Sequence, residues 1–137
     1  MSEQIVVKTI TIASHRIEIS FDFTEGLSPY FDSGQTTFWQ EYTEDMSGVP
    51  SSIAIIPFVC NVLPLVWITD SVLKLPELDE TFSDSIKEFK QGYMDMYPMF
   101  EFKGKIETGH IIRNEYVRYG GNAAFFSGGV DAFTTLV

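Results

Sequence analysis

The chain has 137 residues, of which 45% are hydrophobic and 15% aromatic, so it can bury a core and is not a disordered chain. Its 19 acidic and 9 basic side chains give a formal charge of −10, which argues against nucleic-acid binding because phosphate recognition needs clustered Lys and Arg. The single cysteine, Cys60, excludes an internal disulfide and a cysteine-based zinc site.

The amino terminus and the longest apolar run bear on localisation. Residues 1–4 lead directly into strand-like sequence, without the basic and apolar regions of a signal peptide. Residues 53–68 are apolar apart from Asn61, but they are fewer than the ~20 that a membrane span needs, and Pro57 and Pro64 interrupt them. We therefore expect a cytoplasmic protein that does not enter the membrane.

The first predicted elements are two β-strands, over residues 5–12 and 15–23, both rich in β-branched residues. In the second strand apolar and polar residues alternate, so that Ile17, Ile19, Phe21 and Phe23 share one face and Arg16, Glu18, Ser20 and Asp22 share the other. This pattern predicts a half-buried antiparallel hairpin. Residues 36–42 are compatible with a third strand.

A buried helix and a short buried strand are expected next. Residues 51–63 suit either a buried helix or a buried strand, but their length and the serines at their start favour a helix, which Pro57 kinks or interrupts. Residues 65–69 would then form a short buried strand. Pro76 and the acidic residues around Asp79 indicate a turn.

The clearest periodicity predicts an amphipathic helix after this acidic turn. Its apolar residues recur at helical spacing and form one stripe: Phe82, Ile86, Phe89, Tyr93 and Met96. Thr81 and Asp84 have the spacing of a capping box at its start, and Pro98 ends it. Residues 100–108 resemble a further strand, and a polar connection that contains His110 follows.

These elements predict an α+β domain over residues 1–120, with an antiparallel sheet and two helices. The sequence changes character in residues 121–137. A short apolar strand over residues 122–126 is followed by a glycine-rich turn and the first turns of a helix over residues 132–137. The turn consists of Ser127, Gly128, Gly129, Val130 and Asp131.

A glycine turn between a strand and a helix suits the binding of phosphate. Two glycines let backbone N–H groups approach an anion closely, and the helix start adds the positive end of its dipole. The Ser127 hydroxyl can donate to a phosphate oxygen, and Asp131 is placed either to cap the helix or to help hold the Mg²⁺ that accompanies ATP. No Gly-Lys-Ser/Thr follows, which excludes a Walker-type P-loop.

Residues 125–131 resemble the Ser-Gly-Gly-x-Asp-Ser signature of the PP-loop ATP pyrophosphatase superfamily. That superfamily includes GMP synthetase, NAD synthetase, asparagine synthetase, 7-cyano-7-deazaguanine synthase and tRNA-thiolating enzymes. One position departs from the pattern, because Ala132 stands where the family usually has a second Ser. This replacement removes one hydroxyl donor to pyrophosphate. The resemblance covers residues 122–137 only.

The resemblance implies that the turn binds the pyrophosphate of ATP through Ser127, Gly128, Gly129, Val130 and Asp131, with Asp131 also placed to hold Mg²⁺. It implies an enzyme that splits ATP into AMP and pyrophosphate while adenylating an acceptor, from which a nucleophile such as ammonia or sulfur displaces AMP. The domain over residues 1–120 would then shape the acceptor site, recognise a partner or mediate homo-oligomerisation. The acceptor and the catalytic residues are not indicated.

The helix after the turn is too short to be stable alone, and its parallel neighbour strand would lie beyond Val137. We therefore expect residues 121–137 to be the first strand, loop and helix of an α/β domain, and this segment to be inactive by itself. The alternative is a non-catalytic binding or interaction domain whose glycine turn only resembles the signature.

Other polar and aromatic residues suit ordinary structural roles. His15 and His110 have no acidic residues at metal-ligand spacing, so surface positions are expected for both. The acidic residues at 41–45 and 77–80 are expected to form solvated turns. Aromatic residues at this density usually build a core, which is the expectation for Trp39, Trp67, Tyr93 and Tyr97.

Overall fold

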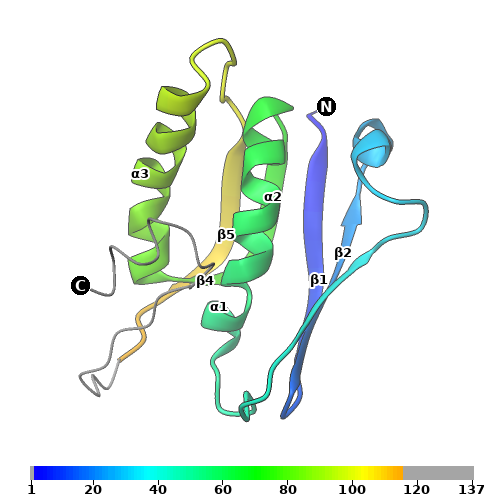
Figure 1. Cartoon of the computed structure of the whole chain (residues 1–137), viewed down its shortest axis with the longest axis vertical. Helices are drawn as coiled ribbons and strands as arrows, with labels where there is room; N and C mark the ends of the chain where they lie inside the picture. The colour runs from blue at the N-terminus through cyan, green and yellow to red at the C-terminus, as the bar shows by residue number, and fades with distance from the viewer. Residues whose placement is uncertain (1, 116–137) are drawn as a thin grey trace, which may run out of the picture.

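The computed structural model describes residues 2–115 of the chain. In chain order the elements are β1 (Gln4–Ile12), β2 (Arg16–Phe23), the 3-10 helix η1 (Glu25–Tyr30), β3 (Thr37–Glu41), α1 (Ser51–Ala54), α2 (Ile56–Ile68), β4 (Val72–Asp79), α3 (Glu80–Met96) and β5 (Lys105–Ile112). Figure 1 shows α2 and α3 on one side of the sheet. The described residues therefore form one layer of strands and one layer of helices.

The five strands lie in the order β3-β2-β1-β4-β5. β2 pairs antiparallel with both β1 and β3, as the hairpin pattern predicts. β4 is parallel to β1, and β5 is parallel to β4, because α1 and α2 form one crossover and α3 forms the next. The predicted α+β class is confirmed, and the sheet joins an antiparallel half to a parallel half.

The alternation in β2 gives the sheet its buried and solvent-facing sides. Ile17, Ile19 and Phe21 are buried, as the period of two predicts. In β1 a bulge shifts the register between Val7 and Thr9. A bulge inserts one residue, so the inward positions change from odd to even numbers along the strand. Ile5 and Val7 are buried before the bulge, and Ile10 and Ile12 pack against the same core after it.

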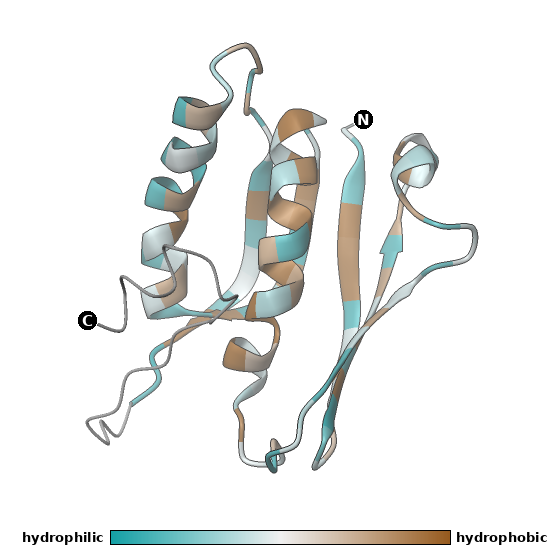
Figure 2. Cartoon of the chain, in the orientation of Figure 1, coloured by the Kyte–Doolittle hydropathy of each residue, from teal (hydrophilic) through white to brown (hydrophobic). Residues whose placement is uncertain are grey.

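The helical interpretation of residues 51–63 is confirmed, and Pro57 lies at the start of α2, where the chain passes from α1. The strand predicted at residues 65–69 is wrong, because α2 continues to Ile68. Burial explains the continuation: Leu63, Val66 and Trp67 are buried at helical spacing and cover the sheet. Figure 2 shows that most of α2 is hydrophobic, so its buried face is not visible as a stripe in the sequence.

The turn predicted around Pro76 and Asp79 is also wrong, because this segment is β4, between β1 and β5. Pro76 has no N–H to donate, but the ladder between β1 and β4 ends at Lys74. On the other side the proline lies against Gly109, where a Cβ would come within 2.6 Å of the Pro76 carbonyl oxygen. β4 therefore accommodates a proline although it pairs with β1 on one side and with β5 on the other.

The amphipathic helix is confirmed as α3, but its N-cap is Asp79 and not Thr81. The Asp79 Oδ2 accepts a hydrogen bond of 3.0 Å from the backbone N–H of Phe82. β5 begins at Lys105, later than the predicted strand start at residue 100. Gly104 explains the later start, because it packs against the end of α2 before the strand ladder begins.

Candidate functional site

The predicted phosphate-binding residues lie outside the described residues 2–115: Ser127, Gly128, Gly129, Val130 and Asp131. Ala132 lies outside them as well. The described residues show where the chain leaves the sheet before it reaches this motif in the sequence. β5 ends at Ile112, so the chain leaves the sheet at the carboxyl end of its parallel strands. In open α/β sheets this is the edge at which ligands bind.

Three segments are joined at this edge by a buried cluster of polar side chains. The Asn114 side-chain amide donates to Ser52 Oγ at 2.9 Å and to Asp79 Oδ1 at 2.8 Å. Ser52 is 1% exposed and Asp79 is 2% exposed. Because the other Asp79 oxygen caps α3, the cluster fixes the position at which the chain departs and has an ordinary structural role.

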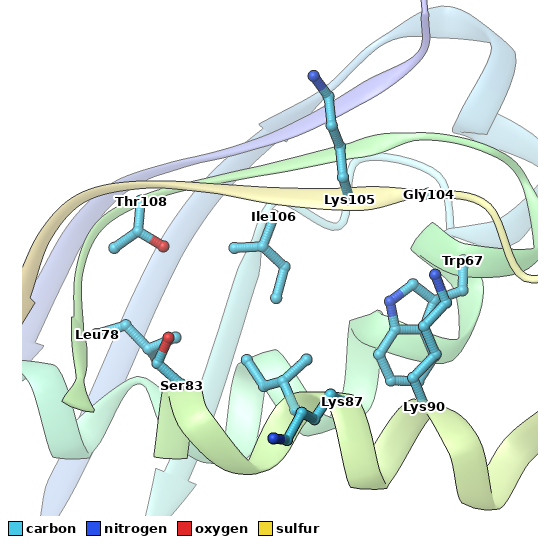
Figure 3. Close-up of a pocket in the computed structure, with 10 residues that line it drawn as sticks. Trp67, Leu78, Ser83, Lys87, Lys90, Gly104, Lys105, Ile106 and Thr108 are labelled. Atoms are coloured by element: carbon cyan, nitrogen blue, oxygen red, sulfur yellow. The ribbon is translucent and has the colours of Figure 1, made fainter. Parts of the chain in front are cut away.

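A groove of about 390 Å³ lies between α3 and β5 (Figure 3). We call it the α3–β5 groove, and its walls are formed by Trp67, Leu78, Ser83, Ile86, Lys87, Lys90, Gly104, Lys105, Ile106 and Thr108. It exists because α3 packs with a half-buried stripe and has no fully buried residue. Its volume is within the range of small-molecule sites, which combine an apolar wall with few polar groups.

The lysines around the α3–β5 groove are not equivalent. Lys90 is half-buried, and its ammonium lies 5.9 Å from the centre of the Trp67 ring. Lys87 is exposed and pairs with Glu88 at 3.5 Å. In Figure 3 the Lys105 side chain points away from α3, and it pairs with Glu107 at 3.0 Å. Lys90 is therefore the cation that belongs to the groove.

A second groove, of about 310 Å³, is apolar and lies between the carboxyl-terminal ends of α2 and α3. Its walls are formed by Pro64, Leu65, Ile68, Tyr93, Tyr97, Phe100 and Phe102. Residues that neighbour its walls in the sequence have large exposed apolar side chains, and Met99 among them is 71% exposed. Contiguous exposed apolar surface marks interaction sites with other molecules or ligand-binding grooves.

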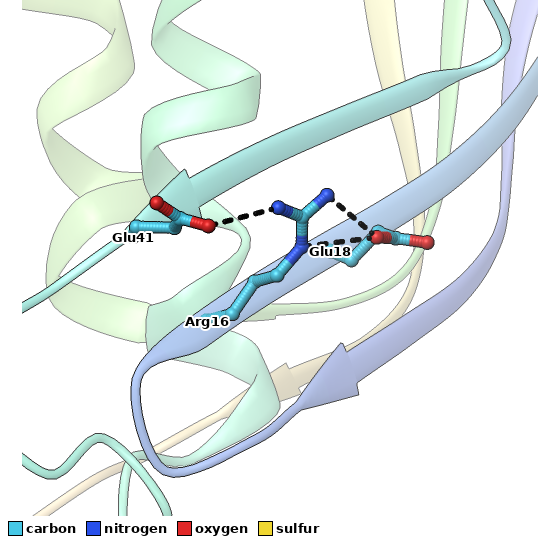
Figure 4. A network of polar contacts seen from close by, with 3 residues as sticks. All are labelled: Arg16, Glu18 and Glu41. Carbon is cyan, nitrogen blue, oxygen red and sulfur yellow. Dashed lines mark hydrogen bonds and ion pairs between the residues drawn. The ribbon is translucent and has the colours of Figure 1, made fainter.

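The face of the sheet opposite the helices bears a charged network (Figure 4). Arg16 donates to Glu18 at 3.1 Å and to Glu41 at 3.2 Å. Its guanidinium also lies 4.4 Å from the centre of the Trp39 ring. Trp39 is 52% exposed, so the prediction that it belongs to the core is wrong. β3 is an edge strand, and the helices cover only the other face.

The three remaining aromatic predictions differ in outcome. Trp67 is 2% exposed and forms edge contacts with Phe89 and Tyr93, which confirms its place in the core. Tyr93 is half-buried and packs against that core. Tyr97 is 44% exposed at the C-cap of α3, so the prediction that it belongs to the core is wrong.

The histidines and the acidic cluster of Glu41, Glu44 and Asp45 are exposed. His15 and His110 are both exposed, as expected, and His15 Nδ1 lies 3.1 Å from the backbone oxygen of Glu44. Hydrogen bonds from the Thr43 side chain and the Ser47 backbone lower the pKa of the Glu44 and Asp45 carboxyl groups respectively. These bonds belong to a solvated turn. Within residues 2–115 no group of three His, Cys, Asp or Glu side chains is arranged to hold a metal ion.

Comparison with known proteins leaves the family open. Neither a protein-family model nor a curated protein nor a solved structure matches this chain. Within the described part of the chain, no helix is both long enough and apolar enough to cross a bilayer.

The sequence reasoning missed the α3–β5 groove, although a signal was present. Ser83, Lys87 and Lys90 recur at helical spacing along one flank of the apolar stripe of α3. That spacing places a hydroxyl and two ammonium groups on the same side of the helix. The spacing does not identify the strand that lies beside these three side chains.

Proposed function

We propose that the protein to which this chain belongs is an ATP-dependent adenylating enzyme of the PP-loop type. The observation that supports the proposal is the run Ser127, Gly128, Gly129, Val130 and Asp131, set between an apolar segment and a helix-forming segment. Such a turn offers backbone N–H groups and a helix dipole to an anion. Residues 1–120 are an accessory domain in this proposal.

In this account each residue of the turn has a distinct task. Gly128 and Gly129 let the backbone N–H groups surround the pyrophosphate of ATP, and Ser127 donates a hydroxyl hydrogen bond to it. Asp131 holds the Mg²⁺ that shields the phosphate charge. Ala132 supplies no hydroxyl, so the pyrophosphate has one donor fewer than in the family pattern.

The reaction proposed is adenylation of an acceptor oxygen. The acceptor attacks the α-phosphorus of ATP, the bond to the bridging oxygen breaks, and pyrophosphate leaves. A nucleophile such as ammonia or sulfur then displaces AMP. Ligase-like enzymes of this kind form amides, nitriles or thiolated products, and the acceptor here is a small molecule or a macromolecule.

The geometry of the described residues supports the proposal in one respect. The parallel strands β1, β4 and β5 have their carboxyl ends at one edge, and the chain departs towards the motif from that edge. The buried bonds of Asn114 to Ser52 and Asp79 hold this departure point in place. A fixed departure point suits a domain that contributes to a neighbouring site.

The identity of the product tests the proposal. The full-length protein is incubated with Mg²⁺, γ-labelled ATP and a small-molecule extract that supplies acceptors. We expect labelled pyrophosphate and unlabelled AMP, and we expect Asp131→Ala to remove both. Asp32→Ala is the matched control, since it removes an exposed carboxylate from a loop far from the motif in sequence. Labelled orthophosphate as the Asp131-dependent product contradicts the proposal.

A non-catalytic interaction domain is the second candidate, and the apolar groove that Tyr97 and Phe100 line is the observation that favours it. The two candidates differ in what the glycine turn must do. An interaction domain keeps its partner when Gly129 is replaced by Trp, whereas the enzyme loses its nucleotide.

A further inference from the structure

We propose that the α3–β5 groove binds a small organic monoanion, a carboxylate with a flat apolar body. This inference goes beyond the nucleotide site and does not depend on it, because every wall residue of the groove lies within the described residues 2–115. It is carried by the volume of the groove, by its apolar wall and by the position of one ammonium group.

The groove has the size and the wall of a small-molecule site. Its volume is about 390 Å³. Ile86 and Ile106 are half-buried and contribute aliphatic walls, whereas Leu78 and Trp67 are 1% and 2% exposed and lie beneath them as its floor. Removing the apolar body of a ligand from water against such walls is favourable in proportion to the apolar area buried.

Charge selects an anion. The chain has 19 acidic and 9 basic residues, so a cation without a carboxylate neighbour is unusual in it. Six of the eight Lys and Arg residues within residues 2–115 form ion pairs, and Lys90 and Lys74 do not. Lys90 is half-buried at the groove, and its contact there is with the Trp67 ring. Its ammonium therefore retains hydrogen-bond donors for a ligand carboxylate.

A single negative charge is indicated, because the other two lysines are turned to other partners. Lys87 pairs with Glu88, and Lys105 points away from α3 and pairs with Glu107 (Figure 3). One ammonium does not compensate a polyphosphate in a groove of this kind. Nor does the groove suit a cationic ligand, since none of its wall residues is a carboxylate.

The end of the groove away from Lys90 selects a polar substituent on the ligand. In Figure 3 the Ser83 side chain on α3 and the Thr108 side chain on β5 face the space between the two elements. Both hydroxyls donate and accept hydrogen bonds. A ligand whose carboxylate meets Lys90 would thus place a hydroxyl or carbonyl group near these two side chains.

The test uses the two tryptophans of the chain. In Trp39→Phe, Trp67 is the remaining tryptophan, and it lines the groove. The 137-residue Trp39→Phe chain is titrated with 2-naphthoate, and Trp67 fluorescence is recorded. We expect saturable quenching by 2-naphthoate and at least fivefold weaker binding of the uncharged 2-naphthamide, since a charge-assisted hydrogen bond is lost. Absence of saturable quenching overturns the proposal.

Two matched pairs of variants locate the site. Lys90→Gln should weaken 2-naphthoate binding about fivefold. Lys74→Gln should leave it unchanged, because Lys74 also forms no ion pair but lies opposite Glu107 in the β4–β5 register and does not line the groove. Thr108→Phe should block the groove, whereas Glu107→Phe should not. Equal effects within either pair overturn the proposal, and circular dichroism confirms that each variant is folded.

Discussion

Gly104 lies against the carbonyl group of Val66 so closely that a Cβ on Gly104 would come within 1.9 Å of the Val66 oxygen. The contact joins the start of β5 to the last turn of α2. Backbone bonds from Lys103 and Gly104 to the Trp67 carbonyl, at 2.9 and 3.3 Å, hold the same junction. One wall of the α3–β5 groove therefore depends on a position that tolerates no side chain.

Gly104→Ala should destabilise the fold, because the added methyl group meets backbone atoms that cannot rotate away. We expect the free energy of unfolding to fall by about 3 kcal/mol in urea titrations. Gly92→Ala is the matched control: Gly92 lies in α3 and has no atom within 4 Å of its added Cβ. It should raise the free energy of unfolding by about 0.5–1 kcal/mol, since alanine favours a helix. Equal changes of the unfolding free energy in the two variants would contradict a close contact between Gly104 and the Val66 carbonyl group.

Asp79→Ala should lower the free energy of unfolding by about 2 kcal/mol. The variant removes the N-cap of α3 and leaves the amide of Asn114 without one of its two acceptors. Thr81→Ala, at the position that the capping-box spacing suggested, should change the free energy of unfolding by less than about 0.5 kcal/mol. A larger loss from Thr81→Ala than from Asp79→Ala would mean that Asp79 is not the cap.

Cys60 should react slowly in the folded chain. Burial raises the pKa of its thiol, so the thiolate, which is the reactive form, is scarcer at a given pH than in the unfolded chain. The folded state holds this proton more tightly, and its contribution to stability is lost as pH rises through the folded-state pKa. Reaction with Ellman's reagent at pH 8 should accelerate when urea unfolds the chain. Equal rates, after correction for urea, would refute this.

Arg16→Ala should cost up to about 1 kcal/mol of unfolding free energy, because Arg16 pairs with two exposed carboxylates and lies over the Trp39 ring. Lys8→Ala removes one exposed ion pair, with Asp22, and should cost less than about 0.5 kcal/mol. Added salt should narrow the difference between the two variants. A difference that salt does not change would mean that packing, and not charge, sets the effect of Arg16.

Elements with local patterns were predictable from the sequence. The alternation of Ile17, Ile19 and Phe21 placed β2 and its buried face correctly, and the stripe from Phe82 to Tyr93 placed α3. Both patterns depend only on the period of one element and on one buried side.

Elements that depend on distant partners were not predictable. β4 contains Pro76, and its strand conformation depends on β1 and on Gly109, far away in the sequence. The α3–β5 groove depends on which strand lies beside α3, and no local pattern shows this. The nucleotide site proposed at residues 127–131 rests on residue types alone.

The binding of Mg-ATP to the full-length protein tests the central claim most directly. Isothermal titration should show one Mg²⁺-dependent ATP site, competed by pyrophosphate, that Gly129→Trp abolishes and Asp131→Ala weakens at least tenfold. Gly48→Trp is the control, because a Cβ at this loop position meets no atom within 4 Å, and it should bind as the unmodified protein does. No ATP binding, or equal binding in Gly129→Trp and Gly48→Trp, would contradict a nucleotide site at the glycine turn.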